Sequence, residues 1–159
     1  IMRKLGNGVA HGGTYTAHSV SMAAAEKCLE ILDETDALER IADYGTRLRN
    51  GMDAVLSARG IPHSFVGHPS MSGLYFAQNP PRNYRDWKGS DYSFYDAMAK
   101  VLHDELILCE PDSREPWFIS AAHDDSCLAE TLAAFEKAVD ATLNGERSVT
   151  ERNYGAQQF

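Results

Sequence analysis

Several features that mark particular classes of protein are scarce or missing in this sequence. Lys and Arg number 15 against 23 Asp and Glu, so the formal net charge is −8. Nucleic-acid phosphates and anionic membrane surfaces require clustered cations instead. No apolar run approaches the roughly 18 residues that cross a bilayer, and the start has no basic stretch leading into an apolar one. We therefore expect a cytoplasmic protein that binds neither nucleic acid nor a membrane.

Cysteine is scarce as well. Cys28, Cys109 and Cys127 are widely spaced and odd in number, which favours reduced core thiols over a disulfide framework. An apolar content of 43% over 159 residues is enough for one domain with its own core. Because the chain starts at Ile1, with no recognisable strand or cap before its first motif, we expect it to be a piece of a longer polypeptide.

Apolar residues recur at helical spacing in four segments. The predicted helices cover residues 19–32, 36–59, 91–106 and 124–143. Gly60 is expected to end the second helix in a left-handed conformation, whereas Gly45 and Gly51 weaken its interior. Asp124 is the expected cap of the last helix, and Ser19 or Ser21 that of the first. The predicted packed side of the first helix consists of Val20, Ala23, Ala24, Leu29 and Leu32.

Short apolar runs between these helices have the composition of strands. Residues 63–66 and 72–77 flank "GHPSM", whose glycine and proline favour a hairpin turn. "LILC" (106–109) and "WFISAA" (117–122) are further candidate strands, and the proline-containing 78–90 is an expected exposed loop. This order predicts an α/β protein, in the form of a small α+β domain whose mainly antiparallel sheet is covered by helices.

The segment "NGVAHGGTYTAHSVSMAAAEKCLEIL" places a glycine pair and hydroxyls directly before the first predicted helix. Backbone N–H groups at a helix start lack partners and carry the positive end of the helix dipole, so Gly12, Gly13, Thr14 and Thr16 are candidates for holding an anion. The glycine–lysine pattern of a Walker loop is missing. From these residues alone, a simple turn and helix cap remains the alternative to an anion site.

Two stretches resemble a known family. "HGGTYTAHSVSMAAAEKCLEIL" is similar to the segment of class III, fold-type I pyridoxal-phosphate (PLP) aminotransferases that reads roughly Gly-Thr-Tyr/Leu-Ser-Gly-His/Asn-Pro before an alanine-rich helix. Residues 72–139 resemble the C-terminal domain of the glutamate-1-semialdehyde 2,1-aminomutase branch, where "NY.DA..SD", a helix, "GV.L.PS" and "F.S.AHT..D…T" recur in the same order. The resemblance spans about residues 1–143 and depends on the order of several motifs.

The resemblance implies a PLP cofactor and a homodimer. In such enzymes the threonine of the Gly-Thr motif donates to the cofactor phosphate of the neighbouring subunit, so Thr14 is the matching residue and Gly13 allows the close backbone approach. A hydroxyl and main-chain donors at a helix entrance suit a phosphate dianion. The sequence departs from the family pattern at Ala17, in place of the usual glycine, and at Ser19, in place of the usual proline.

The resemblance also implies that the catalytic centre lies elsewhere. The lysine that forms the Schiff base with PLP belongs to the large domain upstream of the Gly-Thr motif. Lysines occur only at 4, 27, 88, 100 and 137, none in a matching context, so this chain alone should be inactive. We expect residues 1–32 to be the end of the large domain with an interdomain helix, 33–143 the C-terminal small domain, and 144–159 a polar tail.

Two residues are candidates for substrate binding. Glu110 lies where the resemblance puts the wall of the substrate entrance, and there it would repel a carboxylate and favour an amino or neutral group. Arg114 is the candidate to receive a substrate carboxylate in a two-pronged ion pair, with a solvated loop arginine as the alternative. His63 and His68 flank a turn without a carboxylate at ligand spacing, so we expect no metal site.

The predicted function is that of the C-terminal portion of a PLP-dependent aminotransferase or aminomutase, which moves an amino group on an amino-acid or keto-acid type of substrate. Small-molecule amino donors and acceptors are the expected partners. The alternative is a non-catalytic small domain that mediates assembly or binding. The missing lysine favours this alternative, whereas Thr14 with its glycine pair favours the enzyme, because an assembly module has no need of a phosphate loop.

Overall fold

The computed structural model of the chain describes residues 7–8 and 10–145. The chain divides into two compact units, Ile1–Ala37 and Leu38–Phe159. The predicted domain boundary at residues 32–33 refers to the complete protein and stays a prediction. Most of the predicted polar tail, residues 146–159, lies outside the described residues. No helix among the residues described is both long and apolar enough to span a bilayer.

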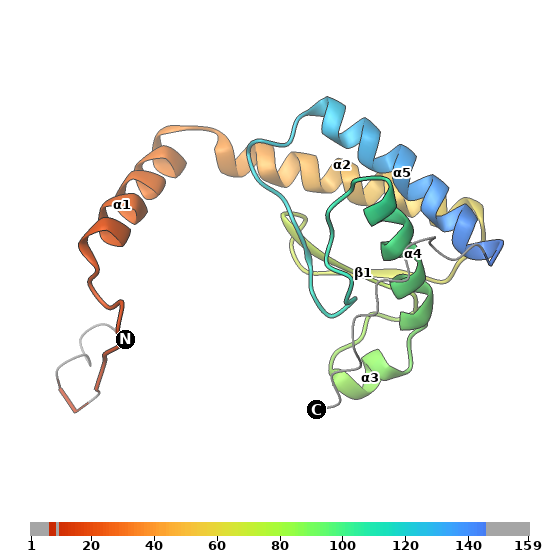
Figure 1. Cartoon of the computed structure of the whole chain (residues 1–159), viewed down its shortest axis with the longest axis horizontal. Helices are drawn as coiled ribbons and strands as arrows, with labels where there is room; N and C mark the ends of the chain where they lie inside the picture. The colour runs from red at the N-terminus through yellow and green to blue at the C-terminus, as the bar shows by residue number, and fades with distance from the viewer. Residues whose placement is uncertain (1–6, 9, 146–159) are drawn as a thin grey trace. The chain divides into compact units, whose positions relative to one another are not determined.

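In the described part of the first unit the regular element is helix α1 (Ser19–Glu34), as predicted from its alanine-rich sequence (Figure 1). The predicted cap was wrong. His18, rather than Ser19 or Ser21, is the N-cap, because its ring accepts from the amide N–H of Ser21 and also contacts the Ser21 hydroxyl at 2.9 Å. Ser19 is therefore the first helical residue, a position at which proline is favoured.

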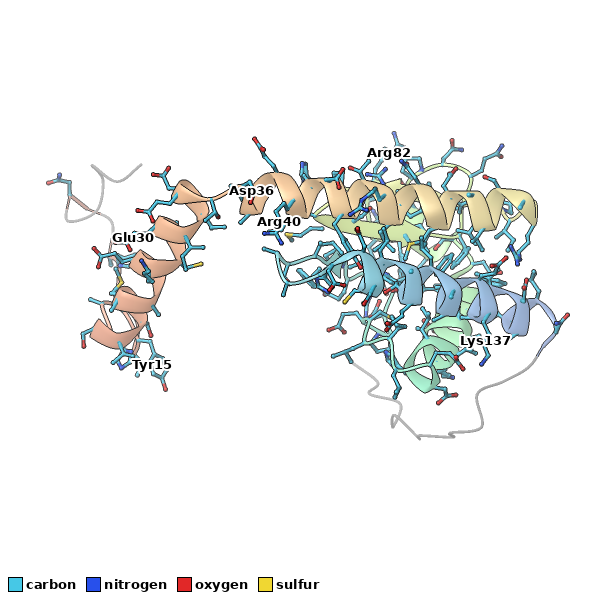
Figure 2. The ribbon with its side chains drawn as sticks, turned by 90° about the horizontal axis from the view of Figure 1, so that it is seen from above. Tyr15, Glu30, Asp36, Arg40, Arg82 and Lys137 are labelled. Atoms are coloured by element: carbon cyan, nitrogen blue, oxygen red, sulfur yellow. The ribbon has the colours of Figure 1, made fainter. Side chains whose placement is uncertain are left out.

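The predicted packed side of α1 was also wrong within this unit. No residue of α1 is buried, and Val20 and Leu29 are 70% and 66% exposed. Figure 2 shows side chains standing out all around this helix, Glu30 among them. A single helix has no second layer in its own unit against which an apolar face can be buried.

The second unit is a three-stranded antiparallel sheet with helices, which confirms the predicted fold class (Figure 1). Its strands are β1 (Ser64–Val66), β2 (Met71–Tyr75) and β3 (Trp117–Phe118). Its helices are α2 (Ala37–Ala58), α3 (Tyr84–Lys88), α4 (Tyr92–Asp104) and α5 (Asp125–Leu143). β2 is the central strand: Phe65 pairs with Leu74 on one side, and Trp117 pairs with Ser72 on the other. The predicted hairpin is confirmed.

The two glycines that weaken α2 by propensity lie where that helix approaches other elements closely. A Cβ on Gly45 would lie 2.2 Å from the carbonyl oxygen of Pro69 in the hairpin turn, and one on Gly51 would lie 2.6 Å from a terminal methyl of Leu132 in α5. Glycine is thus required by packing, which a propensity scale does not contain. Gly60 ends the helix with φ +65°, as predicted.

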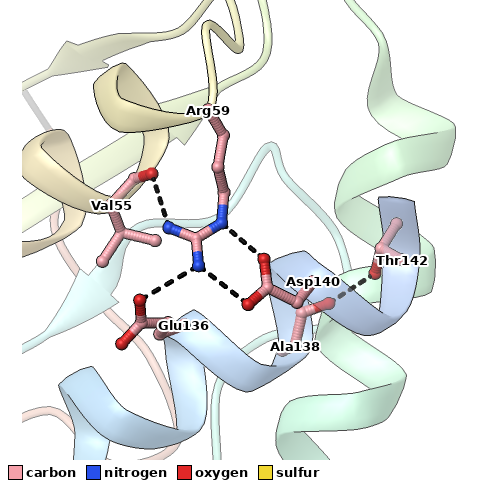
Figure 3. A network of polar contacts seen from close by, with 6 residues as sticks. All are labelled: Val55, Arg59, Glu136, Ala138, Asp140 and Thr142. Atoms are coloured by element: carbon pink, nitrogen blue, oxygen red, sulfur yellow. Dashed lines mark hydrogen bonds and ion pairs between the residues drawn. The ribbon is translucent and has the colours of Figure 1, made fainter. Parts of the chain in front are cut away.

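Helices α2 and α5 run parallel to each other. Arg47 contacts Asp125 near the start of α5, Gly51 contacts Leu132, and Arg59 contacts Asp140 near its end. Beyond the end of α2, the Arg59 guanidinium also donates to Glu136 at 3.0 Å and to the Val55 carbonyl at 3.0 Å (Figure 3). This network fixes the register between the two helices.

The core lies where the helices meet the sheet. Its fully buried large side chains are Leu56, Leu74, Tyr95, Met98, Leu102, Phe135 and Val139. They come from α2, β2, α4 and α5, so each of these elements contributes one apolar face to a single cluster. Asp91 and Asp124 cap α4 and α5 through their carboxylates, in agreement with the prediction.

Two segments differ from the prediction. The expected loop 78–90 contains α3, which Asn83 caps by accepting from the amides of Arg85 and Asp86. "LILC" is not a strand, because α4 ends in a Schellman motif in which Ile107 N–H donates to the Leu102 carbonyl and Leu106 takes φ +65°. The expected strand 117–122 is reduced to Trp117–Phe118.

Candidate functional site

The second unit contains a largely apolar groove with a cavity volume of about 540 Å³. It is lined by Tyr44, Leu48, His103, Ile107, Leu108, Cys109, Glu110, Pro111, Pro116, Trp117, Phe118, Ile119, His123 and Thr131. Most of these residues belong to the irregular segment 107–111 and to the segment 116–119, which contains β3. Small-molecule sites have volumes of roughly 300–1,000 Å³ and mainly apolar linings.

Side chains, rather than a strand ladder, hold the first of these segments in place. His103 Nε2 donates to the Cys109 carbonyl at 2.6 Å, and the Tyr95 hydroxyl donates to the Glu110 carbonyl at 3.1 Å. Trp117 Nε1 in turn donates to the Tyr95 hydroxyl at 3.0 Å. Two consecutive carbonyls are thereby fixed, and with them the backbone at Glu110. Leu108, which precedes them, is 95% exposed.

The buried ionisable groups of this network are neutral. Burial raises the pKa of the Cys109 thiol to about 12, and it raises the pKa of the Tyr95 hydroxyl above its ordinary value. A thiol in this state is a poor nucleophile at neutral pH. Cys109 and Tyr95 therefore position the segment and do not supply reactive groups.

His123 also lines the groove, and the sequence did not single it out. Its Nδ1 accepts from the amide N–H of Ser120 at 3.0 Å. The ring packs against Tyr44, 5.3 Å away between centroids. The signal that could have found it is the "AHT" part of the family pattern, which falls on this histidine.

Arg114 lies against a different hollow, of about 200 Å³, beside Trp87 and Tyr84. Its guanidinium forms a two-pronged ion pair with Asp112, which holds the pKa of that carboxyl below its usual value, and it lies 5.1 Å from the centroid of the Trp87 ring. The two predicted substrate residues are thus not brought together: Glu110 lines the groove, whereas Arg114 lines this hollow.

Gly13 and Thr14 lie in a turn of the first unit, ahead of α1. Thr16 N–H donates to the Gly13 carbonyl at 3.0 Å, and His18 N–H donates to the Tyr15 carbonyl at 3.1 Å. Neither bond uses the amides of Thr14 and Tyr15, and no partner for the Thr14 hydroxyl is found among the described residues. A Cβ on Gly13 would lie 3.1 Å from Thr16 Oγ1. This donor set fits a phosphate.

The non-glycine residues with positive φ in the described part of the chain are Ala17 (φ 60°) and Leu106 (φ 65°). Ala17 stands at the position where the family pattern has glycine. Leu106 stands at the first position of "GV.L.PS" when Pro111 is matched to its proline, and this position is also a glycine. Only glycine adopts the left-handed region without steric cost, so both residues have a backbone conformation that the glycine of the family pattern would adopt freely.

The fold of the chain is similar to that of several solved structures. No family model matches the chain. The solved structures include transaminases, and the fold of the chain matches that of their C-terminal part. One of the solved structures is the FumI protein of Sphingopyxis sp. MTA144, solved in its PLP internal aldimine form, with 28% identity and a TM-score of 0.73 over 89% of this chain.

Two further similarities concern the fold alone. A transaminase with PLP bound has 24% identity and a TM-score of 0.71 over 87% of the chain. An omega-transaminase from Sphaerobacter thermophilus has 22% identity and a TM-score of 0.70 over 85% of the chain. In all three comparisons the present chain spans 31% of the length of the protein it matches.

Proposed function

We propose that this chain is the C-terminal portion of a PLP-dependent aminotransferase that acts as a homodimer in the cytoplasm. The similarity to FumI over 89% of the chain is the observation that carries the proposal. The positive φ of Ala17 and Leu106, at two glycine positions of the family pattern, supports it independently. An aminomutase of the glutamate-1-semialdehyde type would use the same parts, and nothing in the groove favours that narrower reaction.

In this proposal Gly13 and Thr14 hold the cofactor phosphate of the neighbouring subunit. The Thr14 hydroxyl and the adjacent amides donate to phosphate oxygens, and the missing side chain of Gly13 allows the phosphate to approach the backbone. When bound, PLP supplies the electron sink that amino-group transfer requires. The groove forms one wall of the substrate pocket, and its side chains Leu108 and Phe118 exclude water from that pocket.

Three of the four described lysines contact other side chains. Lys27 pairs with Glu30, Lys137 pairs with Glu105, and Lys88 lies over the Tyr84 ring. None of the described lysines lines the groove. We therefore propose that the Schiff-base lysine is supplied by another part of the protein and that the present chain is inactive alone.

Arg114 has a narrower proposed role, the binding of an acceptor's carboxylate. This requires the guanidinium to exchange Asp112 for the ligand. Arg114→Ala should then raise the KM for a keto-acid acceptor and leave the KM for an amine donor without a carboxylate unchanged. If the variant and the wild type have the same KM for the acceptor, Arg114 is only a structural partner of Asp112.

The test of the function is cofactor retention by the longest protein that contains this sequence. Loss of one charge-assisted hydrogen bond costs about 1.5–3 kcal/mol, so Thr14→Ala should weaken PLP binding by roughly ten- to a hundredfold in dialysis followed by absorbance. Thr46→Ala, which removes an exposed hydroxyl bonded to the Ala42 carbonyl, is the matched control. A protein that never takes up PLP would contradict the proposal.

A further inference from the structure

The groove combines an apolar lining with a single charged side chain. Its apolar walls include Leu48, Ile107, Leu108, Trp117, Phe118 and Ile119, and its acidic residue is Glu110. We propose that the groove binds the hydrocarbon body of an amine and that Glu110 excludes ligands carrying a carboxylate. As a statement about the enzyme's substrate, this inference rests on the proposed aminotransferase function. The class of amino donor is then an apolar amine rather than an amino acid.

Glu110 is the single acidic residue among the described residues that line the groove. His103 donates Nε2–H to the Cys109 carbonyl, and His123 accepts a backbone N–H at Nδ1, so each ring already uses one nitrogen on the backbone. Tyr44 has a raised pKa because of burial and keeps its proton. None of the described residues lining the groove is Lys or Arg.

The nearest candidate for a compensating cation faces elsewhere. Arg114 is four residues from Glu110 in sequence, yet it lines the hollow beside Trp87 and is held there by Asp112. A carboxylate in the groove would therefore meet the negative charge of Glu110 with no Lys or Arg among the described lining residues, whereas an ammonium would be attracted. Electrostatic complementarity of this kind provides specificity.

Glu110 is held in a defined position, as selection between ligands requires. Its own carbonyl accepts from the Tyr95 hydroxyl, and the preceding carbonyl accepts from His103. Tyr95 is buried in the core and is further fixed by Trp117, itself a groove residue. The backbone that carries the carboxylate is thus anchored to α4 through two side chains.

The experiment compares two ligands with the same alkyl chain and opposite charge, n-octylamine and octanoate. The longest protein containing this sequence is labelled with 5-fluorotryptophan, and the resonance of Trp117 is assigned with Trp117→Phe. Binding is followed by the shift of that resonance and by calorimetry near pH 7.5. The expected Kd of n-octylamine is at least tenfold lower than that of octanoate.

Glu110→Gln should reduce this ratio to about threefold or less. Glu115→Gln, which removes an exposed carboxylate of the same loop outside the groove lining, should leave the ratio unchanged. Equal affinities in the wild type, a ratio unaffected by Glu110→Gln, or binding without a shift of Trp117 would each overturn the inference.

These outcomes are separate from the test of the enzyme. A protein that prefers n-octylamine in the predicted way but never retains PLP would support the amine-binding groove and reject the aminotransferase. A protein that retains PLP and binds both ligands equally would reject the role of Glu110 and leave the aminotransferase in place.

Discussion

Arg59 and Asp140 join the end of α2 to the last turns of α5 through two parallel hydrogen bonds, Nε to Oδ1 at 2.5 Å and Nη2 to Oδ2 at 2.8 Å. Bidentate pairs of this kind are the ion pairs with the most defined geometry. The hydrogen bonds from Arg59 hold the pKa of the Asp140 carboxyl below its usual value. The pair therefore links the stability of the second unit to pH.

The pH dependence follows from the lowered pKa. The contribution of the pair is fully present above the unfolded pKa of Asp, about 3.9, and it is lost as the pH falls through the folded pKa. Asp140→Asn should lower the Tm near neutral pH and flatten its fall between about pH 5 and pH 2. Thermal melts by circular dichroism measure both effects. Asp43→Asn, which breaks an exposed pair within α2, is the control, and an equal effect there would contradict the prediction.

Leu106→Gly should stabilise the second unit. Leu106 is 90% exposed, so its side chain contributes little burial, and its φ of +65° is costly for leucine. Relief of that cost, less the entropy of glycine, predicts a gain of about 1 kcal/mol in the free energy of unfolding. Urea denaturation is the measurement. Leu108→Gly, an exposed leucine without positive φ, should instead be neutral or destabilising.

Ser72→Ala should also stabilise the protein. The Ser72 hydroxyl is buried and has no hydrogen-bond partner, which costs free energy that alanine does not incur. The expected gain is about 1 kcal/mol. Ser113→Ala is the contrasting variant, because the Ser113 hydroxyl accepts from Trp87 Nε1 at 2.9 Å and its loss leaves a donor unpaired. If both substitutions changed the free energy of unfolding in the same direction, the hydrogen-bonding states assigned to the two hydroxyls would be wrong.

The two glycines of α2 should respond differently to substitution by alanine. At Gly45 the new methyl meets the Pro69 carbonyl at 2.2 Å, a backbone atom that cannot move without the hairpin turn, so a loss of about 3 kcal/mol is expected. At Gly51 it meets a flexible leucine end, and alanine also gains about 1 kcal/mol of helix propensity. Chemical denaturation should give a free energy of unfolding that is well below that of Gly51→Ala for the Gly45→Ala variant.

The sequence alone predicted α1, α2, α4, α5 and the hairpin, because periodic apolar residues and capping carboxylates act within one element, but it missed the short helix α3. The prediction of "LILC" as a strand was wrong, because nothing in the sequence indicates that a leucine at position 106 takes a positive φ. We named Glu110 and Arg114 as substrate-binding candidates from the family resemblance, which does not give the placement of one side chain relative to the other.

Only the tertiary structure separated those two residues. Asp112 draws the Arg114 guanidinium to the hollow beside Trp87, while Tyr95 and His103 hold the backbone at Glu110 beside the groove. The sequence by itself determined the elements and the turn that holds Thr14, because neighbours in the chain form both. The groove and the position of its acidic residue, Glu110, result from packing between segments far apart in sequence, which local patterns do not encode.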